Sequence, residues 1–157
     1  MAVFGKNVFL IRENPSVYIR NAKYHLKPGV GYGKRGDILD AHLLPAGFSF
    51  TSEGLAFTGL GLNSTLLVLA FLNSALTQFT INQYCGQHKQ VGYVNLLPFQ
   101  NISQKEIERI ASNTLKIVNL KQKWVQYDET TRFFKLPLSD FKQISLMELA
   151  KAIRIGM

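Results

Sequence analysis

Basic residues and glycines are concentrated in one short segment near the N-terminal end, residues 27–36, which read K-P-G-V-G-Y-G-K-R-G. The glycines allow the backbone to lie close to a phosphodiester. Lys34 and Arg35 can neutralise phosphate charge, and Tyr32 offers a ring and a hydroxyl. Because proline and glycine at this density are typical of turns, we expect an exposed loop. A plain surface turn accounts for the same residues equally well.

Residues 31–36 also match G-x-G-x-x-G, the string that in dinucleotide-binding proteins opens a helix whose N-terminus binds the pyrophosphate. That use requires a helix to begin inside the motif. The following residues, 37–45, are too few and end at a proline, so we do not expect a dinucleotide site.

Residues with catalytic potential occur without the partners that they need. Residues 14–17, N-P-S-V, lack the second proline and the ring of the N-P-P-Y/F motif with which adenine methyltransferases stack a flipped base. No G-x-S-x-G string occurs, the acidic residues are not paired, and the three histidines are scattered. With Cys85 as the single cysteine, neither an internal disulfide nor a zinc set is predicted. We therefore expect no catalysis, metal or cofactor in this chain.

The chain has 157 residues, of which 46% are hydrophobic and 18% charged, so it can form one globular domain. The longest strongly apolar run, Leu66 to Leu72, is far shorter than the ~20 residues of a membrane-spanning helix. Lys6 and Arg12 interrupt the first apolar stretch, which does not resemble a secretory signal. We expect a cytoplasmic protein without membrane contact.

The formal net charge is +8, with 18 Lys and Arg against 10 Asp and Glu. Most of the excess lies in residues 1–36 and 102–157, whereas residues 37–101 are slightly acidic. A polyanion is therefore the first partner to consider. The alternative is a basic surface that aids solubility and has no particular ligand.

Hydrophobic patterning predicts an α+β fold: a twisted, mostly antiparallel sheet from the first half, with a buried helix at 64–84. We expect a returning strand near Val91 to Val94. A long amphipathic helix should follow at 103–125, because Ser103-Gln104-Lys105-Glu106 forms a capping box. Short strands are predicted at 8–11 and 17–19, with two more within 38–51, and a last amphipathic piece at 146–153.

Four segments in this order resemble one family: residues 27–37 (K-P-G-V-G-Y-G-K-R-G-D), 43–54 (L-L-P-A-G-F-S-F-T-S-E-G), 66–74 (L-L-V-L-A-F-L-N-S) and 90–99 (Q-V-G-Y-V-N-L-L-P-F). They are similar to the C-terminal target-recognition, or specificity, domain of large adenine-specific DNA methyltransferases of the type IIG restriction-modification or BREX phage-defence kind. Residues 102–123 are similar to the helix that closes each recognition domain in type I specificity subunits, and residues 124–130 to the segment after it.

This resemblance covers about residues 20–135. It implies a DNA target-recognition domain over 1–135, including the closing helix, and a C-terminal helical extension over 136–157. It further implies that the chain is a fragment, whose methyltransferase domain in the full-length protein binds S-adenosylmethionine and flips the target adenine. Two departures are present: Tyr93 stands where the family usually has an acidic residue, and residues 85–89 differ from the usual asparagine-rich turn.

We expect double-stranded DNA as the partner. The candidate phosphate contacts are Arg20, Lys23, Lys27, Lys34 and Arg35, and the candidate base contacts are Tyr32, His88, Lys89 and Gln90. The alternative is a protein-interaction module that docks through the apolar stripe of helix 103–125. An intact small methyltransferase is a third alternative.

Overall fold

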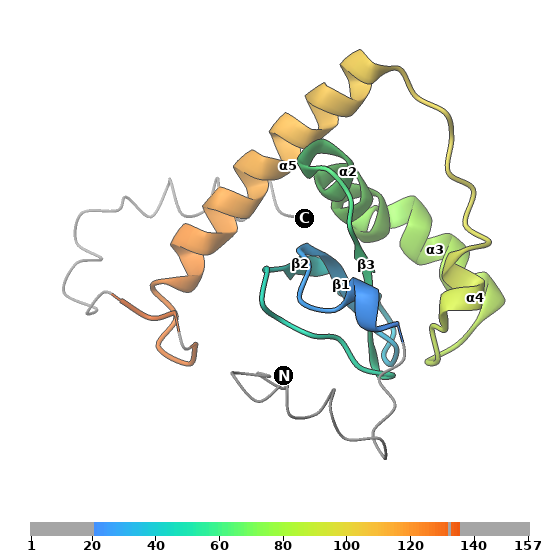
Figure 1. Ribbon diagram of the computed structural model, residues 1–157, viewed down its shortest axis with the longest axis horizontal. Coiled ribbons are helices and arrows are strands. Elements are labelled where there is room, and N and C mark those ends of the chain that lie inside the picture. Colours follow the sequence, from blue (N-terminus) through green and yellow to red (C-terminus); the bar gives the residue numbers. More distant parts are fainter. Residues whose placement is uncertain (1–20, 132, 136–157) are drawn as a thin grey trace. The chain divides into compact units, whose positions relative to one another are not determined.

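The computed structural model describes residues 21–131 and 133–135 (Figure 1). The chain divides into two compact units, Met1–Ala111 and Ser112–Met157, whose boundary lies within the longest helix. The first unit contains a three-stranded antiparallel sheet accompanied by helices, so the α+β fold class is confirmed. The strands expected at 8–11 and 17–19 and the helix expected at 146–153 lie outside the described residues.

The sheet has the strand order β2-β1-β3, with β1 at Gly29–Gly33, β2 at His42–Leu44 and β3 at Gly54–Thr58. Both neighbours run antiparallel to β1, which pairs Gly29 with Leu44 on one side and with Thr58 on the other. The prediction of an exposed loop at 27–36 is therefore wrong for 29–33, which form the central strand. Residues 38–51 form one strand instead of two, and β3 was not predicted.

Glycine is compatible with the central strand here because the chains approach closely. A Cβ placed on Gly29 would lie 1.9 Å from the carbonyl oxygen of Phe57, so no larger residue fits. The side chains between the glycines belong to the hydrophobic core: Val30 is 0% and Tyr32 1% exposed. The Tyr32 ring stacks on Phe57 with 5.9 Å between ring centroids. A segment of turn-like composition is thus a strand whose first four residues are all buried.

The long helix predicted at 64–84 is two helices, α2 at Leu62–Asn73 and α3 at Ala75–Tyr84, bent by 63° at their junction. Ser74 makes the break, because its extended backbone ends α2 while its side chain accepts a hydrogen bond from Thr77 N–H and caps α3. α2 contacts β1 and buries Leu66, Leu69 and Leu72.

α3 is largely exposed, so the prediction of a buried helix holds only for α2. Leu76 and Phe79 are 70% and 67% exposed. Across the described ranges no single helix is long and apolar enough to cross a membrane, although the bent α2–α3 pair together passes that test of length and composition.

The strand expected at 91–94 is a short helix, α4, at Val91–Val94. The carbonyl of Gln90 accepts hydrogen bonds from the N–H groups of Tyr93 and Val94, which closes a turn and leaves Val94 buried. The β propensity of Val91, Tyr93 and Val94 is here overridden by local turn bonding and by the burial of one side chain. A short 3₁₀ helix, η1, lies at Ala22–Tyr24.

The long helix, α5, spans Gln104–Val125 and confirms the prediction at 103–125. Its capping box is present: Glu106 N–H donates to Ser103 Oγ, and the Glu106 carboxylate accepts from both the backbone N–H and the hydroxyl of Ser103. These bonds lower the pKa of Glu106. Ile117, Leu120 and Trp124 are 50%, 44% and 50% exposed.

Replacing Tyr32 by Phe should not destabilise the protein, because no atom of the described residues hydrogen-bonds the buried Tyr32 hydroxyl. Burial raises the pKa of Tyr32 to about 12. In the unfolded chain this group ionises near pH 10, so its contribution to stability is present below pH 10 and is lost between about pH 10 and 12.

Urea unfolding of wild type and Tyr32→Phe at pH 7 and through pH 9–12 measures both effects. The variant should match or exceed wild type at pH 7. It should also lose less stability in the alkaline range, by up to about 2–3 kcal/mol. A clear loss of stability at pH 7 would show that the hydroxyl is satisfied.

Candidate nucleic-acid interface

Two segments that lie some fifty residues apart in the sequence, 34–36 and 86–90, are joined by hydrogen bonds just after the end of β1. The Lys89 N–H donates to the Lys34 carbonyl at 2.7 Å, and the Gly36 N–H donates to the Gln87 carbonyl at 3.1 Å. Arg35 and His88 form an isolated antiparallel bridge between them. The structure thus brings together five of the nine residues selected from the sequence, namely Lys34, Arg35, His88, Lys89 and Gln90. We call residues 34–36 and 86–90 the paired loops.

Lys89 holds the paired loops together through hydrogen bonds from its buried side chain. Its side chain is 0% exposed, and its ammonium donates to the carbonyls of Gly36 at 2.5 Å and Gly86 at 3.1 Å. An ammonium buried this deeply is tolerated only where acceptors replace its water. The expectation that Lys89 contacts DNA from an exposed loop is therefore wrong, since the same bonds that hold the loops withdraw this side chain from the surface.

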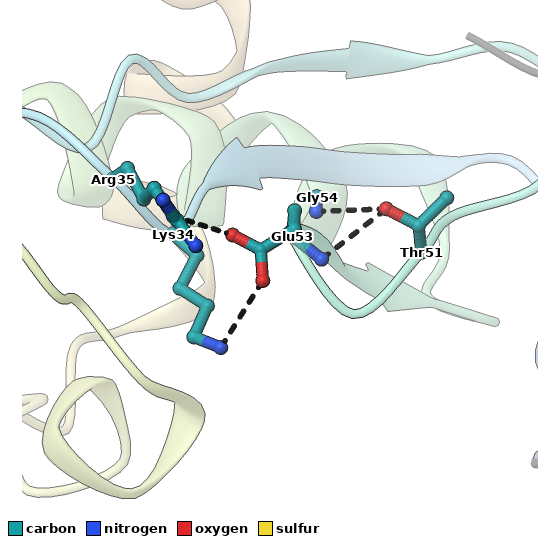
Figure 2. Close-up of polar contacts among 5 residues, drawn as sticks. All are labelled: Lys34, Arg35, Thr51, Glu53 and Gly54. Carbon is teal, nitrogen blue, oxygen red and sulfur yellow. Dashed lines mark hydrogen bonds and ion pairs between the residues drawn. The ribbon is translucent and has the colours of Figure 1, made fainter.

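Lys34 and Arg35 project beyond β1 and share one carboxylate, that of Glu53 (Figure 2). Arg35 Nε lies 2.8 Å from one Glu53 oxygen and Lys34 Nζ lies 3.4 Å from the other. The Arg35 side chain is 68% exposed, so this guanidinium faces solvent. The hydrogen bond from Arg35, together with the charges of both cations, lowers the pKa of Glu53. The three side chains therefore carry a net charge of +1 at neutral pH.

A tight turn before β3 fixes the position of Glu53. Thr51 Oγ1 accepts hydrogen bonds from the backbone N–H of Glu53 at 3.2 Å and of Gly54 at 3.1 Å (Figure 2). The Lys34 N–H donates to the Glu53 carbonyl at 2.9 Å, which extends the β1–β3 ladder by one bond. Glu53 was not selected from the sequence. The turn signature T-S-E-G at 51–54 could have indicated it.

Two side-chain amides of α3, one helical turn apart, form hydrogen bonds that hold the segment after β1. Gln78 accepts from the Leu39 N–H at 3.1 Å and donates to the Leu72 carbonyl, which ties the end of α2 to the segment after β1. Asn82 donates to the Asp37 carbonyl at 3.0 Å. Gly36 adopts φ +117°, a conformation that favours glycine. The Lys34–Asp37 turn is thus fixed at both sides.

The remaining predicted contacts are dispersed. Tyr32 is buried in the core, so the expectation that its ring or hydroxyl is accessible is wrong. Lys23 and Lys27 are exposed, but Lys27 precedes β1 whereas Lys34 follows it. Seven residues of extended chain span ~23 Å, so these lysines would engage different phosphates. His88 and Gln90 are exposed beside Arg35, and Arg20 lies outside the described residues.

Comparison with protein-family models and with curated proteins finds no match for this chain. Within residues 21–131 and 133–135, no group of three or more His, Cys, Asp or Glu side chains is placed to hold a metal ion. The chemistry that the paired loops offer is that of an exposed guanidinium, the half-buried ammonium of Lys34, an imidazole and an amide. These groups suit phosphate and polar base edges.

Lys89→Met should destabilise the protein by about 1–3 kcal/mol, because the carbonyls of Gly36 and Gly86 would lose their donor. Lys27→Met, at an exposed lysine, is the matched control and should stay within about 0.5 kcal/mol of wild type. Urea unfolding followed by circular dichroism measures both. Equal stability of the two variants would contradict the role of Lys89 as a fastener.

Glu53→Gln should increase the affinity for duplex DNA about two- to fivefold, because it removes a negative charge that competes with phosphate for Lys34 and Arg35. Fluorescence anisotropy with a labelled duplex at pH 7 measures this gain. As the pH falls through the lowered pKa of Glu53, the carboxylate becomes protonated and the wild type should approach the variant. Weaker binding by Glu53→Gln would mean that the carboxylate is needed to position the cations.

Proposed function

We propose that this chain is a non-catalytic DNA target-recognition domain that belongs to an adenine-specific DNA methyltransferase of a restriction-modification or phage-defence system. The observation that carries the proposal is the joining of the paired loops. It places the exposed cation of Arg35 beside two exposed polar side chains, His88 and Gln90, on one rigid edge. Cations position a protein on the DNA backbone, and neighbouring polar groups read base edges.

The charge distribution supports the same partner. The chain carries a net +8, and the sequence up to residue 36 contributes most of the excess. Lys23 and Lys27, before β1, offer further cations to phosphates at some distance from Arg35. A domain with this arrangement binds any duplex weakly through phosphates, with Kd about 10⁻⁴ to 10⁻⁶ M at physiological salt, and gains specificity from the polar side chains.

The type of enzyme is suggested by the ordered resemblance of residues 20–135 to methyltransferase specificity domains. On this proposal S-adenosylmethionine and the flipped adenine bind to a separate methyltransferase domain of the same full-length protein. This chain binds the duplex. Its contribution to catalysis is the placement of the target base.

A protein-interaction module is the second candidate, and the exposure of Ile117, Leu120 and Trp124 on α5 favours it. These apolar side chains share a helix with Lys116, Lys121 and Lys123. The two candidates respond differently to salt, because phosphate contacts release counterions whereas an apolar interface barely changes.

The test is duplex binding by the wild type and by the double variant Lys34→Gln/Arg35→Gln between 50 and 200 mM salt. For the wild type, log K should fall linearly with log[salt]. The variant should bind more weakly, with a slope reduced by about 1–2, because up to two phosphate contacts are lost.

Lys116→Gln/Lys123→Gln removes the same charge from α5 and is the matched control. Its slope of log K against log[salt] should equal that of wild type, apart from the decrease that the lower net charge alone causes. If both double variants weaken binding equally, net charge alone explains DNA binding. Salt-independent binding would favour the apolar interface.

A further inference from the structure

One face of the sheet carries a pocket of about 260 Å³ that the proposed phosphate contacts do not use. Its lining includes Gly31 and His42 from paired positions of β1 and β2, Gly54 of β3, and Phe50 and Thr51 of the loop between β2 and β3. Residues that pair across antiparallel strands point to the same face. Gly31, His42 and Gly54 therefore share the face opposite to the Tyr32 side chain, and the lining is completed by Tyr32, Leu44, Ser49 and Leu55.

Two glycines that line this pocket, Gly31 and Gly54, form what we call its floor. At Gly31 the fold itself requires glycine, because a Cβ would lie 2.9 Å from His42 Nε2. At Gly54 it does not, because among the described residues the nearest atom to a Cβ is Thr51 Oγ1 at 3.9 Å, an ordinary contact. Neither glycine has a positive φ. Glycine in a strand interior costs about 0.5–1 kcal/mol relative to alanine and marks places where a ligand approaches the backbone.

The walls suit a flat heteroaromatic group. Phe50 stacks on His25 at 4.2 Å between nearly parallel rings, which fixes the plane of its own ring. The His42 ring lies over Gly31, where its Nε2 would be 2.9 Å from a Cβ, and its Nδ1 is 3.1 Å from the Asp40 carbonyl. With Nδ1 as the donor in that bond, Nε2 is left as an acceptor. Aromatic rings and a few polar atoms beside a glycine floor are the usual means of binding an unpaired base.

The edge of the pocket adjoins the cation pair. Thr51 and Gly54 line the pocket and also hold Glu53 in the turn that contacts Lys34 and Arg35 (Figure 2). A base on the glycine floor would therefore have its phosphate close to these two cations. We infer that the pocket binds one unpaired nucleobase of DNA whose phosphate lies at Lys34 and Arg35. This inference rests on the proposed function for its ligand and adds a subsite to it.

The test compares three labelled DNAs in anisotropy titrations: a perfect duplex, the same duplex with a single-nucleotide bulge, and the bulge with an abasic site in place of the base. The bulged duplex should bind about tenfold more tightly than the perfect one, and the abasic bulge should lose that gain. Gly54→Ala should abolish the preference for the bulge while leaving affinity for the perfect duplex unchanged. Its Cβ fills the floor without a clash.

Gly61→Ala, at a glycine with open space around it outside the pocket, is the matched control and should keep the preference. Thermal unfolding should show Gly54→Ala to be at least as stable as wild type. Binding of the perfect duplex with no preference for the bulge, or a preference that survives Gly54→Ala, would overturn the inference alone. Binding of neither duplex would overturn both the inference and the proposed function.

Discussion

The arrangement of the candidate site depends on the burial of one ammonium group. Lys89 is fully covered, and its charge is compensated by the carbonyls of Gly36 and Gly86 instead of by a carboxylate. Those carbonyls belong to two different segments, so the ammonium cannot be satisfied unless the segments lie together. The backbone bonds from Lys89 to Lys34 and from Gly36 to Gln87 then follow. One buried charge therefore organises the exposed residues on both segments.

The exposed cations are restrained by a second, much weaker interaction. Glu53 bridges Lys34 and Arg35 in solvent, where such ion pairs contribute little to stability. A phosphate can therefore replace the carboxylate at modest cost, whereas the paired loops stay fixed by their backbone hydrogen bonds and by Lys89. A hydrogen-bonded support with an exchangeable counterion is a suitable arrangement for binding a polyanion, and the pocket beside it offers room for a base.

Local signals in the sequence predicted some elements well and others poorly. The capping box at Ser103 and Glu106 located α5, because the bonds that begin this helix lie within four residues. β1 was taken for a loop because its glycines suit turns, and the close approach of Phe57 that requires Gly29 comes from a distant segment. The break at Ser74 depends on the extended backbone of this residue and on its cap to Thr77, which apolar composition alone does not indicate.

The candidate site was predicted in part for the same reason. Charge and glycine content indicated Lys34 and Arg35, and the polar side chains of a predicted neighbouring loop indicated residues 88–90. The burial of Lys89 and the ion pairs of Lys34 and Arg35 with Glu53 depend on contacts between segments 18 or more residues apart, which no local pattern encodes.

The most direct test of this account is nuclear magnetic resonance mapping of the chain during titration with a short duplex at low salt. The account predicts that the amide signals of residues 34–36 and 86–90 shift together along one binding curve, while those of the exposed part of α5, residues 115–124, stay in place. Shifts confined to α5, or shifts of 34–36 without 86–90, would contradict it.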